Sequence, residues 1–266
     1  MNGVQLYGRY LGASLRSQMQ YRASAIMQAF GSMVTIVTEF AAIWALFDRF
    51  GSLSGWSLYE IMLFYGTVNV AFSIAEASAR GFDTFSRMIR GGDFDRILLR
   101  PRSPALQIAG QELQTMRVGR LLQGLAILIW GSVAMGLTWT VGKALVMLFA
   151  VIGGACLFAG LFILQATLCF WTTESLEVMN TVTYGGTETA QYPVTIYRKW
   201  FRQFFTYVVP LAAVTYYPIV YVLGRADPLG TSTVFQVLAP TIGLFFLVVS
   251  LKVWKIGIRH YRSTGS

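Results

Sequence analysis

The chain has 266 residues, of which 55% are hydrophobic, 15% are aromatic and only 12% are charged, and its formal net charge is +9. Soluble domains carry about 25% charged residues, so this deficit excludes an ordinary soluble protein. The basic residues alternate with long apolar blocks, which indicates membrane topology, and nucleic-acid binding is not expected.

Residues 1–23 are predicted to form an amphipathic interfacial helix on the inner leaflet of the lipid bilayer. Four residues recur there at four-residue spacing, with three arginines nearby: Tyr7, Leu11, Leu15 and Met19. An alternative is that this segment only extends the first membrane helix. The apolar blocks at 24–47 and 58–79 then predict the first two crossings, since about 20 helical residues span a bilayer.

Further charge-poor blocks predict the later crossings. Residues 113–137 and 143–172 form the third and fourth, and residues 234–255 form the last. Their apolar stretches are continuous, which is typical of membrane helices. Together with one crossing between the fourth and the last, the chain is predicted to be an all-α integral membrane protein. Its six transmembrane helices are expected to form a single transmembrane domain, 1–266.

The fifth crossing has two possible positions. Three basic residues in the polar segment 173–202 favour a cytoplasmic loop there, with 203–224 as the crossing: Arg198, Lys199 and Arg202. Against this, Pro210 and Pro218 interrupt that run, and two prolines are unfavourable inside an unbroken lipid-facing helix. In the second topology, 174–192 is a polar crossing and 200–224 form a broken hairpin that dips back from outside.

Arginine and lysine set the predicted orientation. Fifteen of the 21 basic residues fall on one side of the membrane if the two termini share that side. Basic residues concentrate in cytoplasmic loops, so both termini and the loop 80–110 are predicted to be cytoplasmic.

Two carboxylates lie within apolar blocks. Glu39 is near the middle of the first crossing, where a charge costs at least ~2.5 kcal/mol, so it is a candidate functional residue. Glu76 is one helical turn from Arg80 and is expected to pair with it. The two carboxylates and four other polar residues are candidates to line a substrate path: Glu39, Asn69, Glu76, Asn180, Tyr184 and Gln191. A purely structural role in helix packing is the alternative.

The stretch RMIRGGDFDRILLRPRSP, Arg87 to Pro104, stands out between two apolar blocks. Its arginines are expected to hold the loop on the cytoplasmic side of the membrane. Membrane orientation does not explain the glycine, aspartate and proline residues of the stretch. The Gly91–Gly92 pair interrupts helical structure, Asp93 is placed to cap a short helix, and Pro101 is placed to end that helix. The pattern predicts a stiff, short element within this loop.

The same stretch resembles the signature of the permease subunits of type 2 ABC exporters, Gly-x-x-Asp-x-x-Leu-Leu-Arg-Pro-x-Ser-Pro. The matching residues are Gly92, Asp95, Leu98, Leu99, Arg100, Pro101, Ser103 and Pro104. The stretches FWTTESLEVMNTVTYGG, QYPVTIYRKWF, PLAAVTYYPIVYVLGRADPLG and WKIGIRHYRSTGS also resemble an uncharacterised bacterial branch of this family. The resemblance covers essentially the whole chain.

This resemblance implies a transport subunit of the bacterial cytoplasmic (inner) membrane. Two permeases, identical or different, would pair, and two separate ABC ATPase subunits would dock on their cytoplasmic loops. The chain itself would bind no cofactor, and ATP and Mg would be held by the ATPase. The family also carries re-entrant helices before its last crossing, which favours the second topology, with 193–230 extracytoplasmic or re-entrant. The residues expected to contact the ATPase are Arg90, Gly92, Asp93, Asp95, Leu98, Leu99, Arg100 and Pro101.

Two other classes of function are the alternatives. A secondary transporter or channel driven by an ion gradient would suit Glu39, but would leave the arginine-rich loop without a purpose. A membrane-bound enzyme lacks support, since the sequence shows no Ser/His/Asp set or paired catalytic carboxylates. His260 is the sole histidine, so no metal site is expected.

Overall fold

The computed structural model describes residues 12, 22–110, 116–172 and 176–261. Within them the regular structure is helical, as expected for an all-α protein. The interfacial helix predicted for 1–23 lies almost entirely outside the described residues. Its last two positions, Arg22 and Ala23, already belong to the first long helix.

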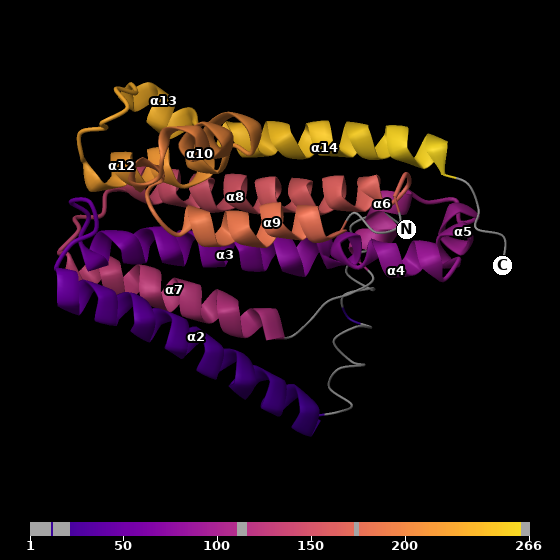
Figure 1. Ribbon diagram of the computed structural model, residues 1–266, viewed down its shortest axis with the longest axis horizontal. Helices are drawn as coiled ribbons and strands as arrows, with labels where there is room; N and C mark the ends of the chain where they lie inside the picture. Colours follow the sequence, from indigo (N-terminus) through magenta and orange to yellow (C-terminus); the bar gives the residue numbers. More distant parts are fainter. Residues whose placement is uncertain (1–11, 13–21, 111–115, 173–175, 262–266) are drawn as a thin grey trace.

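Six longer helices follow the length of the molecule. They are α2 (Arg22–Phe50), α3 (Leu58–Asp83), α7 (Met116–Ala134), α8 (Val141–Leu168), α9 (Leu176–Ala190) and α14 (Thr241–His260). Helix α2 meets the others near its C-terminal end and diverges from them toward its N-terminal end (Figure 1). The central helix is α3, which packs against α7 on one side and against α8 and α9 on the other. Helix α14 covers the far side of α8, and α2 packs mainly against α7, with Phe40 also against Tyr65 of α3.

Three helical stretches are long and apolar enough to cross a membrane: Leu58–Arg90, Val141–Leu168 and Thr241–His260. A fourth arises if the bent pair Lys199–Val208 and Leu211–Leu223 counts as one span. By length and composition, the described residues therefore support three or four of the six expected crossings. The apolar stretch of α7, Gly119–Ala134, is shorter than the usual span.

Short helices gather toward the two ends of the bundle (Figure 1). One end carries α4 (Phe85–Arg90), α5 (Asp93–Leu98) and α6 (Pro104–Ala109); we call it the α5 end. Toward the opposite end lie η1 (Val194–Ile196), α10 (Lys199–Gln203), the π-helix η2 (Phe204–Val208), α11 (Leu211–Val214), α12 (Tyr216–Leu223) and α13 (Thr233–Leu238). Helix α9 runs from the α5 end toward these helices.

The run 203–224 is not one helix. Val209 adopts an extended conformation, Pro210 precedes α11, and the chain bends by 70° at this break. Proline cannot donate the hydrogen bond that a continuing helix needs, which accounts for the position of the break. The run therefore forms either a broken span or a re-entrant loop, and both topologies stay open.

Glycine permits the closest helix contacts. A Cβ atom at Gly243 of α14 would overlap with the carbonyl oxygen of Gly153 in α8. A Cβ atom at Gly81 of α3 would overlap in the same way with the carbonyl oxygen of Ile108 in α6. Small residues of this kind let backbones approach in membrane proteins, where apolar burial alone does not drive helices together.

At the end opposite α5, polar contacts join distant segments. The Ser57 hydroxyl caps α3 and the Glu60 carboxylate accepts from the Ser57 amide, at 2.8 Å. Glu60 also accepts from Arg225, at 2.8 Å, which ties the start of α3 to the loop after α12. In that loop, burial would raise the pKa of Asp227, but hydrogen bonds from Thr231, Leu229 and Tyr216 outweigh burial and hold its pKa below its usual value.

Candidate functional site

The arginine-rich stretch folds into two short helices, α4 and α5, separated by Gly91 and Gly92. Gly92 has φ = 70°, a left-handed conformation that glycine adopts without strain, and it occupies the N-cap position of α5. The expectation that Asp93 caps this helix is wrong, because Asp93 is already its first residue and no side chain caps it. Helix α5 ends at Leu98, three residues before Pro101, as predicted.

Aromatic side chains hold α5 against the bundle. The rings of Phe94 and Phe85 meet edge to face with centroids 5.0 Å apart, and Phe94 also contacts Phe170 and Tyr261. Trp254 of α14 packs on the same cluster. Phe94 and Trp254 are 0% and 1% exposed, so one face of α5 is fixed to the ends of the long helices.

The other face of α5 and the residues after it are exposed. Leu99 is 85% exposed and Leu98 is 38% exposed. Leucine side chains are more often buried, so two consecutive exposed leucines are a notable feature of this arginine-rich loop. The predicted contact residues Arg90, Asp93, Arg100 and Pro101 are exposed as well. Beside them lies a polar pocket of about 390 Å³, lined by Thr84, Arg87, Met88, Asp93, Arg96, Ile97 and Arg100.

Asp95 differs from the other predicted contact residues. It is partly buried, and its carboxylate lies near Tyr261, which follows α14. Burial and this neighbouring carboxylate raise the pKa of Tyr261 to about 12. Asp95 therefore faces the protein, whereas Asp93 forms an exposed pair with Arg96 at 3.6 Å.

A second polar group lies inside the bundle near the α5 end. The Arg80 guanidinium on α3 contacts the Asp83 carboxylate at 2.6 Å and the Glu76 carboxylate at 3.4 Å, which confirms the expected Glu76–Arg80 pair. Glu76 also lies 3.5 Å from Arg120 of α7, and its own side chain is fully buried. Two carboxylates thus face two guanidinium groups, and the formal charges of this group cancel.

Side chains of α8 and α9 complete this network. The Tyr184 hydroxyl of α9 donates to Asp83 at 3.1 Å and accepts from Arg80 at 2.9 Å. Gln165 of α8 donates to Asp83 at 3.1 Å and to Asn180 of α9 at 3.0 Å. We call these seven residues the inner polar network: Glu76, Arg80, Asp83, Arg120, Gln165, Asn180 and Tyr184. It connects four long helices through ion pairs and hydrogen bonds.

The structure separates the predicted path residues into two groups. Glu76, Asn180 and Tyr184 meet in the inner polar network. Glu39 instead lies on an exposed face of α2, where the Tyr65 hydroxyl donates to it at 3.5 Å. Asn69 is buried and donates to the Tyr65 carbonyl oxygen of its own helix, at 2.9 Å. Gln191 is buried just after α9.

Three polar residues of these groups were not predicted from the sequence as functional candidates: Asp83, Arg120 and Glu188. Asp83 could have been found from its spacing, because residues 76, 80 and 83 share one face of a helix. The sequence indicates Arg120 only as a charge that orients the protein in the membrane. Glu188 is exposed on α9 and is close enough to Glu39 for the two carboxylates to repel each other, a proximity with no signal in the sequence.

A family model described as "ABC-2 family transporter protein" matches residues 33–265, almost the whole chain. No curated protein and no solved structure matches the chain.

Proposed function

The chain belongs to the ABC-2 family of transporter membrane proteins, and from that premise we propose that it is the permease subunit of an ATP-driven exporter. It pairs with a second permease, identical or different, and forms the translocation path with it. Separate ABC ATPase subunits bind ATP and Mg and drive the transport cycle. The chain contributes the membrane path and binds no nucleotide itself.

One observation carries this proposal, the shape of the segment around α5. Its inner face is fixed by Phe94 in the aromatic cluster, and its outer face presents Leu98, Leu99 and Arg100. Exposed leucines beside a cation fit a protein interface, where apolar anchors are surrounded by polar residues. A short helix held rigidly against α14 can pass a movement of the ATPase to the long helices. Arg90, Gly92, Asp93 and Pro101 flank this contact, while Asp95 supports it through Tyr261.

The proposed topology has six crossings: α2, α3, α7, α8, α9 and α14. The α5 end and both termini face the cytoplasm of a bacterial cell, in the inner membrane, as the concentration of basic residues indicates. Helix α9 has 15 residues and spans about 22 Å, so it crosses as a short polar helix packed within the bundle. The bent segment from α10 to α12 then re-enters the membrane from outside, which agrees with its 70° bend.

Two groups of polar residues have separate roles in this proposal. Glu39, with its neighbour Glu188, faces the substrate path and attracts cationic groups of the substrate. Glu76, Asn180 and Tyr184 belong to the inner polar network and keep α9 closed against α3. Asn69 and Gln191 are assigned to helix packing near that path.

The pair of carboxylates Glu39 and Glu188 also favours the second candidate function, a transporter driven by an ion gradient. Such a transporter would exchange protons or cations at these carboxylates and would need no ATPase. Transport by purified protein in vesicles separates the two functions. Export that requires ATP and an ABC ATPase supports the exporter, whereas export driven by an imposed ion gradient alone supports the alternative.

The exposed face of α5 gives the sharper test. Leu99→Ser combined with Arg100→Ala should leave the protein folded and inserted, since both side chains are exposed. Loss of two interface anchors should reduce the ABC ATPase that co-purifies with the tagged permease at least about tenfold. The amount of ATPase is measured in membranes from cells that express the whole complex.

The matched control is Arg87→Lys with Arg90→Lys, which keeps the charges of the same loop and should retain the ATPase. Normal ATPase recovery and ATP-dependent transport by the Leu99/Arg100 variant would show that this loop only orients the protein.

A further inference from the structure

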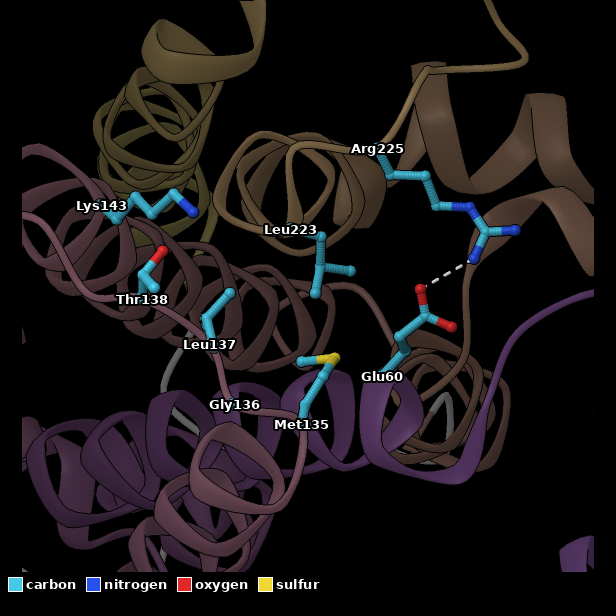
Figure 2. A pocket seen from close by; sticks show the side chains of 8 residues that line it. All are labelled: Glu60, Met135, Gly136, Leu137, Thr138, Lys143, Leu223 and Arg225. Carbon is cyan, nitrogen blue, oxygen red and sulfur yellow. Dashed lines mark hydrogen bonds and ion pairs between the residues drawn. The ribbon is translucent and has the colours of Figure 1, made fainter.

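A pocket of about 540 Å³ lies at the end of the bundle opposite α5 (Figure 2). Three separate segments form it: the first turn of α3, the turn between α7 and α8 with the start of α8, and the end of α12. Its lining residues are Glu60, Met135, Gly136, Leu137, Thr138, Lys143, Leu223 and Arg225. Pockets that bind small molecules have about this volume.

Two of the charged lining residues satisfy each other. Glu60 accepts from Arg225 at 2.8 Å, and it also accepts from the amide and hydroxyl of Ser57. Arg225 donates to the Gly55 carbonyl oxygen at 2.9 Å and lies 4.0 Å over the ring of Trp56. Neither charge needs a ligand, because this pair fastens the loop after α12 to α3.

Lys143 supplies the remaining charge of the pocket. In the part of the chain that the structure describes, its amine has no ion-pair partner. Figure 2 shows its amine and the Thr138 hydroxyl on one side of the pocket, across from the Glu60–Arg225 pair. Lys143 lies in the first turn of α8, where a cation opposes the helix dipole, so helix stability does not explain it.

We propose that this pocket binds a phosphate group at the level of the lipid headgroups. The pocket lies where α3 and α8 begin and α7 ends, which places it at the membrane surface on that side. Its formal charge is +1, which matches the single negative charge of a phosphodiester. Lys143 neutralises the phosphate, the Thr138 hydroxyl donates a hydrogen bond to it, and Met135 and Leu223 contact the apolar part of the ligand. The phosphate comes from a membrane phospholipid or from the aqueous phase.

Titration of the full-length protein with short-chain lipids, followed by native mass spectrometry, tests this site. Dioctanoyl phosphatidylglycerol should bind, and dioctanoylglycerol, which lacks the phosphate, should bind more weakly. Lys143→Gln should weaken binding of the phospholipid about fivefold, the effect of removing one cation near a membrane surface. Lys143→Arg keeps the charge and should retain binding. Inorganic phosphate that displaces the lipid identifies a soluble phosphate as a second source, and failure to displace it assigns the site to the lipid headgroup.

The matched control is Lys255→Gln, which removes an exposed lysine from the last turns of α14 at the α5 end. It should bind the phospholipid as the unaltered protein does. The proposal is overturned if Lys143→Gln binds normally, if Lys255→Gln weakens binding equally, or if the phosphate-free lipid binds as tightly. Thermal unfolding of each variant verifies that its fold is intact. The result does not depend on the exporter role.

Discussion

At the scale of single residues, the charged side chains of the inner polar network form ion pairs with one another. Asp83 receives three contacts, from Arg80, Tyr184 and Gln165, and its side chain is only 9% exposed. Removing one partner of a buried ion pair leaves the other charge uncompensated, which costs far more than losing a pair in water. Asp83 and Arg80 therefore each join three other members of the inner polar network.

Asp83→Ala should lower the free energy of unfolding by about 3–5 kcal/mol, because Arg80 would lose its closest carboxylate inside the protein. The matched control is Asp93→Ala. Asp93 also pairs with an arginine three residues away, but the side chains are 63% and 82% exposed, and the expected loss is about 0–1 kcal/mol. Thermal or denaturant unfolding of the purified variants measures both, and equal losses would contradict this account.

At the scale of helices, the distance between neighbouring helices decides which glycines can be replaced by a larger residue. Helices α8 and α14 approach so closely at Gly153 and Gly243 that no side chain fits between them. Gly185 in α9 has open space where a Cβ would lie. The same residue type thus has opposite consequences in two helices of one bundle, since alanine is the better helix former wherever it fits.

Gly243→Ala should separate α14 from α8 and destabilise the protein by about 1–3 kcal/mol, the usual cost of overpacking. Gly185→Ala should be neutral or stabilise it by up to about 1 kcal/mol. The measurement is the unfolding temperature of each variant in detergent. If the two substitutions change it alike, the close contact between α8 and α14 is not a feature of the folded protein.

At the scale of the whole molecule, the two ends of the bundle differ in character. The α5 end carries two exposed leucines among arginines and the inner polar network. The opposite end carries the broken helices α10 to α12 and the Glu60–Arg225 pair. In the proposed orientation, the α5 end meets the ATPase and the opposite end faces outward.

Single cysteines should report this polarity in intact cells. With Cys156 and Cys169 replaced by serine, Arg198→Cys should react with an impermeant thiol reagent from outside, while Ser103→Cys should react only after permeabilisation. Both positions are exposed, so burial does not limit the reaction. Labelling of residue 103 from outside would invert the orientation. Protection of residue 198 in intact cells would indicate instead that the segment before α10 is cytoplasmic.

The sequence by itself determined the membrane class, the helical architecture, the short helix ended before Pro101 and the Glu76–Arg80 pair. Each of these is local, because hydropathy, charge and turn residues are read within one or two helical turns. The family resemblance was confirmed over residues 33–265. The interfacial helix at 1–23 stays a prediction.

Tertiary structure alone decided which distant groups meet. Tyr184 and Asp83 are 101 residues apart in the chain, and Arg225 and Glu60 are 165 apart. It also showed that Gly92 rather than Asp93 occupies the N-cap position of α5, that Asp95 faces Tyr261, and that Glu39 lies on an exposed face of α2. Such contacts depend on which helix faces pack together, and packing is set by the shapes of all neighbouring side chains at once. No short stretch of sequence contains that information.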